Sequence, residues 1–176
     1  MSNLHIPLSR GLTAKVSPED YDWLSQWKWS ALKTGGATRC ERITRFYACR
    51  VQTVAGKQKM FLMHRQIAGA TERAEKVDHR DRDTLNNTRE NLRLCDGSQN
   101  DLNRVGWSGK TTSRFKGVSL ETGKTKWRAG FRGRYLGVFD TEEEAASAYN
   151  VAALQATTPH ERGFLALNLI DGGAYL

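Results

Sequence analysis

Paired cysteines, long apolar runs and a secretion signal are all missing from this 176-residue sequence. Its three cysteines, Cys40, Cys49 and Cys95, form no CxxC pair and leave an odd thiol, which argues against a disulfide framework and a zinc ribbon. No apolar run reaches the roughly 18 residues of a membrane span. The first residues, MSNLHIPLSRG, also lack the apolar segment and cleavage site of a signal peptide. We therefore expect a soluble, intracellular protein with no membrane partner.

Acidic residues are the scarcer charge, because 19 Asp and Glu stand against 27 Lys and Arg and give a formal net charge of +8. Excess positive potential attracts polyanions, so a nucleic acid is the leading candidate partner. Charge is a weak selector of partner, and a protein that is merely basic is the alternative. The length allows one compact domain or two small ones.

The first part of the chain predicts a small mixed module. A helix is expected after Ser17, because Pro18 and two acidic residues follow a residue type that caps helices. Alternation from Phe46 to Met63, with a turn at Ala55 to Lys57, predicts a hairpin. A short helix over His64 to Ala68 should follow it.

Residues 77–100, VDHRDRDTLNNTRENLRLCDGSQN, are poor in apolar side chains and rich in groups that bind metals or move protons. The pattern predicts a strand over 76–79, a polar loop, a second strand over 91–95 and a helix that begins near Gln99. Asp78 and His79 place a carboxylate beside an imidazole. A hard cation prefers oxygen ligands and a neutral imidazole can accept a proton from water, as hydrolysis of a phosphodiester requires. An Asp-His pair alone is weak evidence, and an ordinary polar loop is the alternative.

The order of an Asp-His strand, a loop rich in Asn and Asp, ENLRLC and a helix starting SQN resembles the His-Asn-His (HNH) nuclease motif. This motif belongs to the ββα-metal superfamily, and the form with a final Asn occurs in phage and intron-associated homing endonucleases. The resemblance implies that His79 is the general base, that Asp78 and Asn100 are metal ligands, and that Asn91 orders the loop and orients the base. Asn87 is the alternative for the middle position.

The final Asn keeps an oxygen ligand for Mg²⁺ or Mn²⁺ and removes a nitrogen that zinc would favour. We therefore expect one magnesium-class ion per active site, no structural zinc and no small-molecule cofactor. The resemblance extends upstream through IPLSRG, DYDWLSQWKW, the YACR hairpin and MHR. It suggests that His64 takes part in catalysis and that Arg65 contacts DNA, while a structural hydrogen-bonding role is the alternative for His64.

Residues 105–112 are rich in small and polar side chains and predict a linker. Beyond it the pattern predicts three strands, at 114–120, 125–132 and 135–139, and then a helix opened by a Thr141–Glu144 capping box. The central strand alternates between an apolar and a basic set of side chains, namely Trp127, Ala129 and Phe131 against Arg128, Gly130 and Arg132. One face of this sheet should therefore pack on the helix and the other should be open.

This region resembles the APETALA-type, or ethylene-response-factor, DNA-binding domain through FKGV, KWRA, LGVFDTEEEAA and AYNVAAL. In that family a three-stranded sheet lies in the major groove, with a helix packed behind it. The resemblance implies six DNA-binding residues here: Arg114, Lys116, Arg128, Arg132, Arg134 and Tyr135. Ser119 and Tyr135 stand where the plant proteins usually carry arginine and tryptophan, so the base sequence that those proteins read does not transfer. A solvated basic face is the alternative.

These patterns together predict an α+β chain with an HNH nuclease domain over residues 1–104, whose ββα motif covers about 76–104, and an APETALA-type domain over 113–176. The expected activity is site-directed endonucleolytic cleavage of double-stranded DNA, in the cytoplasm of a bacterial host if the protein is phage-encoded. A DNA-binding transcriptional regulator with a degenerate nuclease module is the alternative. The sequence leaves open the recognition site, cleavage of one strand or two, the choice of Mg²⁺ or Mn²⁺, and the oligomeric state.

Overall fold

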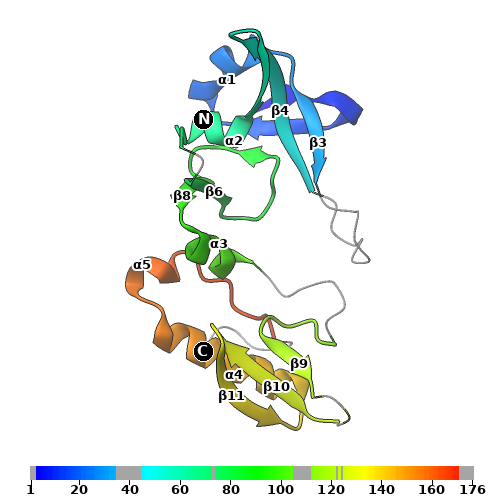
Figure 1. Cartoon of the computed structure of the whole chain (residues 1–176), viewed down its shortest axis with the longest axis vertical. Helices are drawn as coiled ribbons and strands as arrows, with labels where there is room; N and C mark the ends of the chain where they lie inside the picture. The colour runs from blue at the N-terminus through cyan, green and yellow to red at the C-terminus, as the bar shows by residue number, and fades with distance from the viewer. Residues whose placement is uncertain are drawn as a thin grey trace. The chain divides into compact units, whose positions relative to one another are not determined.

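The computed structural model describes residues 3–34, 45–72, 74–104, 112–121, 123 and 125–170. Within these residues the chain is an α+β protein with five α-helices and four small sheets (Figure 1). The α+β class is confirmed. No helix in this part of the chain is long and apolar enough to cross a membrane.

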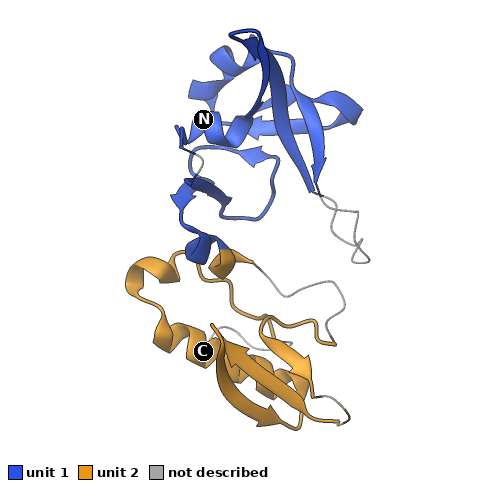
Figure 2. Cartoon of the chain, viewed as in Figure 1, with its two compact units in different colours: residues 1–36, 44–100 blue, residues 37–43, 101–176 orange. Residues whose placement is uncertain are grey.

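The chain divides into two compact units, of which unit 1 comprises residues 1–36 and 44–100, and unit 2 residues 37–43 and 101–176 (Figure 2). The division falls after Asn100, earlier than the expected domain end at residue 104. The reason lies within unit 2, where Leu102 O accepts hydrogen bonds from Ala166 N and from Lys116 Nζ, both at 2.9 Å. The expected linker, apart from Thr112, lies outside the described residues.

Unit 1 begins with two sheets and two helices. In chain order these elements are β1 (Leu4–Pro7), η1 (Ser9–Gly11), β2 (Thr13–Val16), α1 (Pro18–Ser25), β3 (Ser30–Thr34), β4 (Arg45–Val54), β5 (Lys57–Leu62) and α2 (Met63–Ile67). The helix after Ser17 and the β4–β5 hairpin are confirmed. The hairpin turns through Ala55 and Gly56, which have φ of 50° and 75°. Two successive positive φ values are typical of the type I′ turn, whose twist matches that of the strands.

The core of unit 1 gathers apolar side chains from both sheets and both helices, including Ile6, Val16, Leu24 and Met63. Met63 and Ile67 anchor α2 in this core, and one residue between them in the sequence is buried as well. That residue is His64, which is buried. The core of unit 1 therefore holds His64 in a fixed position.

The polar segment of residues 77–100 contributes to a two-stranded antiparallel sheet and to the helix that follows it. Its elements are β6 (Lys76–His79), β7 (Asn86–Asn87), β8 (Leu92–Cys95) and α3 (Gly97–Asn103); β6 pairs with β8, while β7 pairs in parallel with β2. The helix begins at Gly97, two residues earlier than expected. Asp96 and Gln99 explain this start, because the Asp96 carboxylate accepts from Gln99 N at 2.8 Å and the Gln99 side chain accepts from Asp96 N at 3.0 Å.

Unit 2 is a three-stranded antiparallel sheet packed on one long helix, as expected. Its elements are β9 (Val118–Leu120), β10 (Trp127–Phe131), β11 (Arg134–Phe139), α4 (Glu142–Ala156) and α5 (Pro159–Arg162), with strand order β11-β10-β9. The Thr141–Glu144 capping box is present. The first strand starts at Val118 and not at residue 114, because Gly117 turns the chain with φ of 74°. Ala129, Ala145 and Ala146 form the centre of the core.

Candidate active site

His79 ends β6, and only 5% of its surface is exposed. Its Nε2 lies 3.3 Å from Oδ1 of Asn87, which is itself fully buried. The Asn87 amide nitrogen donates to Leu85 O at 3.2 Å, so Oδ1 is the atom that meets the ring as an acceptor. Nε2 of His79 therefore carries the proton, and the neutral ring has its lone pair on Nδ1. This is the state in which an imidazole can accept a proton.

Asn91 closes the loop between β6 and β8. Its Nδ2 donates to Asp81 Oδ1 at 2.9 Å and to Asn86 O at 2.7 Å, and its Oδ1 accepts from Asp81 N at 3.0 Å. Three bonds from one side chain hold both ends of the loop. The expected ordering role of Asn91 agrees with this geometry, whereas the side chain that contacts His79 is that of Asn87, the alternative for the middle position.

Two aromatic rings from other elements lie against His79. The ring centroid of His64, on α2, lies 5.2 Å from that of His79, and the Tyr47 ring, on β4, lies 5.4 Å from His64 and 6.2 Å from His79. Tyr47 could not be placed here from the sequence, because strand alternation assigns a face of the hairpin but not the group opposite it. The structure thus brings His64 next to His79.

Burial keeps both histidines uncharged at neutral pH. It lowers the pKa of His64 to about 3, with smaller effects from the charges of His79 and Arg65. Burial also lowers the pKa of His79, although the hydrogen bond to Asn87 and the nearby carboxylates of Asp81, Asp78 and Asp83 act in the opposite direction. A neutral His64 has no positive charge to offer a phosphate, and its ring packs against those of Tyr47 and His79.

Asp78 precedes His79 and is held by a buried arginine. Asp78 and Arg93 are directly opposite in the β6–β8 ladder, and Asp78 Oδ2 accepts from Arg93 Nε at 2.8 Å and from Nη2 at 2.6 Å. Both side chains are less than 10% exposed. Sequence reasoning missed Arg93, although opposite charges at facing positions of two predicted strands were a usable signal.

The expected metal ligands supply the donor chemistry of a magnesium-class ion. Asp78 offers a carboxylate and Asn100, in the middle of α3, offers an amide oxygen. Mg²⁺ is commonly bound through one or two protein oxygens, waters and substrate phosphate. Within the described ranges, no group of three or more His, Cys, Asp or Glu side chains could hold a metal ion.

Arg65 lies on α2 and is committed to the protein backbone. Its guanidinium donates to Glu75 O at 2.6 Å, Glu72 O at 2.7 Å and Ala70 O at 3.3 Å. These bonds organise the connection between α2 and β6. The structure therefore gives Arg65 a structural role, and its expected contact with DNA stays a prediction.

In unit 2, Arg128 and Tyr135 share the open face of the sheet. The guanidinium carbon of Arg128 lies 5.3 Å from the centre of the Tyr135 ring, and both residues are exposed. Arg128 is paired with Ser119 and Val138 in the ladder, on the face opposite to Ala129 and the helix. The predicted division of β10 into a packed and an open face is thus correct.

Three of the other four predicted DNA contacts of unit 2 have partners within the unit. Arg114 pairs with Glu142 and Glu143, at the start of α4, and Arg132 Nη2 donates to Glu161 Oε1 at 2.6 Å. Lys116 Nζ donates to Asp101 O at 2.8 Å as well as to Leu102 O. Burial, more than the charge of Arg104, lowers the pKa of Lys116 to about 8.

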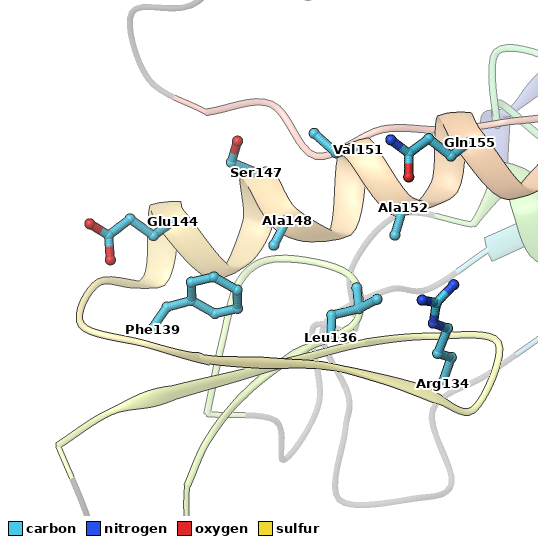
Figure 3. Close-up of a pocket in the computed structure, with 9 residues that line it drawn as sticks. All are labelled: Arg134, Leu136, Phe139, Glu144, Ser147, Ala148, Val151, Ala152 and Gln155. Atoms are coloured by element: carbon cyan, nitrogen blue, oxygen red, sulfur yellow. The ribbon is translucent and has the colours of Figure 1, made fainter.

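Arg134 lies on the helix side of the sheet, because it faces Phe131 in the ladder. It lines one end of a hollow of about 500 Å³ between β11 and α4, with Leu136, Phe139 and Ala148 among the other lining residues. Figure 3 shows its guanidinium directed toward α4. Arg134 therefore does not share the face of Arg128.

In comparisons with known proteins, no family model, curated protein or solved structure matches the chain.

Proposed function

We propose that this chain is a metal-dependent DNA endonuclease of the HNH type, in which β6, β8 and α3 form the catalytic motif. The observation that carries the proposal is the state of His79. It is buried, its tautomer is set by Asn87, and it follows a carboxylate on the same strand. Perturbed histidines with a defined partner concentrate at functional sites.

In this proposal each residue of the site has a separate role. Nδ1 of His79 accepts the proton of the water that attacks the phosphorus, while Asn87 keeps the opposite nitrogen protonated. Asn91 holds the loop that carries Asn87. A divalent ion held by Asp78 and Asn100 would neutralise charge on the phosphate and on the leaving oxygen.

Unit 2 is proposed to bind duplex DNA through the open face that carries Arg128 and Tyr135. A two-unit arrangement gains affinity from a second linked site. An arginine on a strand in the major groove can read guanine, and an exposed tyrosine can donate to a phosphate or a base. The sheet would supply position and some sequence preference.

A second candidate is a DNA-binding regulator whose nuclease module does not cut. The ion pair between Asp78 and Arg93 favours it, because a metal ligand is here bound to an arginine. Both candidates bind DNA, and only the first cleaves it.

Plasmid cleavage separates the two candidates. With Mg²⁺, the full chain should nick or linearise supercoiled plasmid, and His79→Ala should reduce the rate by about 10²- to 10⁴-fold, the usual contribution of a general base. Duplex binding should be unchanged, and EDTA should stop cleavage. His5→Ala is the matched control, because His5 is exposed on β1. If His79→Ala cuts as fast as the parent protein, His79 is not the base.

A further inference from the structure

We propose that Arg93 competes with the divalent ion for Asp78 and so weakens metal binding in the free protein. This inference rests on the proposed function and names a residue that controls its metal site. Arg93 is not one of the expected site residues.

The geometry makes Arg93 a built-in partner of Asp78. Strand register places the two residues opposite each other, and two nitrogens of Arg93 donate to the same carboxylate oxygen, Oδ2. The side chains are 9% and 7% exposed, so water screens their attraction poorly. A charge-assisted pair of this kind is strong and holds the carboxylate in one orientation.

A divalent ion at Asp78 would meet this guanidinium at close range. The ion and Arg93 are both positive, and in a poorly hydrated site their repulsion is only weakly screened. The ion must therefore share the carboxylate with Arg93 or displace it. A DNA phosphate brings further negative charge to the ion, so the competition weakens when substrate is present.

Unit 1 contains a similar pair that does not involve the site. Arg89 donates from Nε to Asp20 Oδ2 at 2.8 Å and from Nη2 to Asp20 Oδ1 at 2.7 Å, and Asp20 is fully buried. Arg89→Gln removes one positive charge and the partner of a buried aspartate, as Arg93→Gln does; it also breaks the longer contact of Arg89 with Glu19, at 3.8 Å. It leaves Asp78 and Arg93 in place, which makes it a matched control.

The test is titration of the full-length protein with Mn²⁺, followed by electron paramagnetic resonance of the free ion. We expect Arg93→Gln to bind Mn²⁺ about tenfold more tightly than the parent protein, because Asp78 loses its competitor. Arg89→Gln should bind as the parent protein does, and Asp78→Asn should lose the site. Added Mn²⁺ should also raise the unfolding temperature of Arg93→Gln more than that of the parent protein.

A purely structural role for Arg93 predicts a different result. Arg93→Gln would then unfold at a lower temperature but bind Mn²⁺ with unchanged or weaker affinity, and either result overturns the inference. If Arg93→Gln does not fold, Arg93→Lys decides, since one ammonium cannot reproduce the two-nitrogen grip. It should bind Mn²⁺ about threefold more tightly, and unchanged affinity overturns the inference.

The two proposals fail in different ways. If the parent protein and Asp78→Asn bind Mn²⁺ equally, Asp78 is not a metal ligand, and the metal site of the proposed function fails together with the inference. If Asp78→Asn alone loses binding while Arg93→Gln matches the parent protein, the metal site stands and only the role of Arg93 is wrong.

Discussion

The polar side chains of the two units differ in burial. Unit 1 buries Asp78, His79, His64 and Asn87, each less than 10% exposed, and gathers them around β6. Unit 2 keeps its charged side chains near the surface and joins many of them in ion pairs, among them Arg114 with Glu143 and Lys126 with Asp140. Burial alters proton affinity, whereas surface pairing mainly neutralises charge.

This difference limits what net charge says about DNA binding. The chain carries a net charge of +8, but several basic side chains of unit 2 have carboxylates or backbone carbonyls as partners. Arg128 is the member of the predicted set that lies beside Tyr135 on the open face. Placement on that face, and not the sum of charges, should therefore decide which arginines matter.

The largest expected effect on stability comes from a substitution that destabilises unit 2 and leaves unit 1 unchanged. A Cβ at Gly117 would lie 2.2 Å from Tyr149 Cδ2 and 2.5 Å from Gly130 O, and the residue has φ of 74°. Gly117→Ala should therefore cost unit 2 about 3 kcal/mol or more, from overlap and from a strained backbone. Thermal unfolding of the full chain should show a lower transition for unit 2 and an unchanged one for unit 1.

Gly123→Ala is the control for this variant. Gly123 also has φ of 74°, but no atom lies within 4 Å of its added Cβ, so only the strain of about 1 kcal/mol remains. Plasmid cleavage by Gly117→Ala should persist with weaker DNA binding. Loss of both unfolding transitions together would mean that unit 1 depends on unit 2 for its stability.

Sequence patterns predicted the local structure well, because local chemistry determines it. The β4–β5 hairpin, the strand over Lys76–His79 and the capping box of α4 follow from alternation, turn residues and caps. Strand β9 was predicted too long, since nothing in FKGV reveals that Gly117 must turn beneath Tyr149. Such a close approach depends on Tyr149, which lies 32 residues later in the chain, near the middle of α4.

The candidate site was predictable only in part for the same reason. Asp78 and His79 are adjacent in sequence, so one motif finds both. Tyr47 and Arg93 reach the site through tertiary contact or strand pairing. The ion pairs of Arg114 and Arg132 likewise need the helices to be placed before their partners are known.

The second-largest expected effect is a loss of stability at acidic pH, and it tests the burial of His64 in unit 1. The pKa of His64 is lowered from 6.5 to about 3, so the unfolded chain binds a proton at acidic pH that the folded chain does not. Stability from this group is therefore complete above about pH 6.5 and falls as the pH drops toward 3. At pH 4.5 the loss should be about 2.7 kcal/mol, from about 1.36 kcal/mol per pH unit.

Urea unfolding at pH 7 and pH 4.5, in EDTA, measures this loss. His64→Gln should lose about 2.7 kcal/mol less than the parent protein between the two pH values, because glutamine does not titrate. Equal losses in the two proteins would mean that His64 is protonated in the folded state and is not buried as described.

The smallest expected effect is on DNA affinity. Two arginines of unit 2 that lie in different places test it. Arg128→Ala and Arg132→Ala change the net charge equally, so a nonspecific effect of charge would be the same for both. Glu161 stays ionised, because hydrogen bonds from Thr158 N and from Arg132 lower its pKa to about 2. Arg132 is thereby neutralised, whereas Arg128 lies on the open face beside Tyr135.

Fluorescence anisotropy with a mixed-sequence duplex at fixed salt should separate these two variants. We expect Arg128→Ala to weaken binding by about 1–2 kcal/mol and Arg132→Ala by less than about 1 kcal/mol. Equal losses would mean that DNA draws Arg132 away from Glu161, and Glu161→Gln should then strengthen binding. If neither variant changes the affinity, the duplex does not bind this sheet, and the DNA contacts must be sought in unit 1.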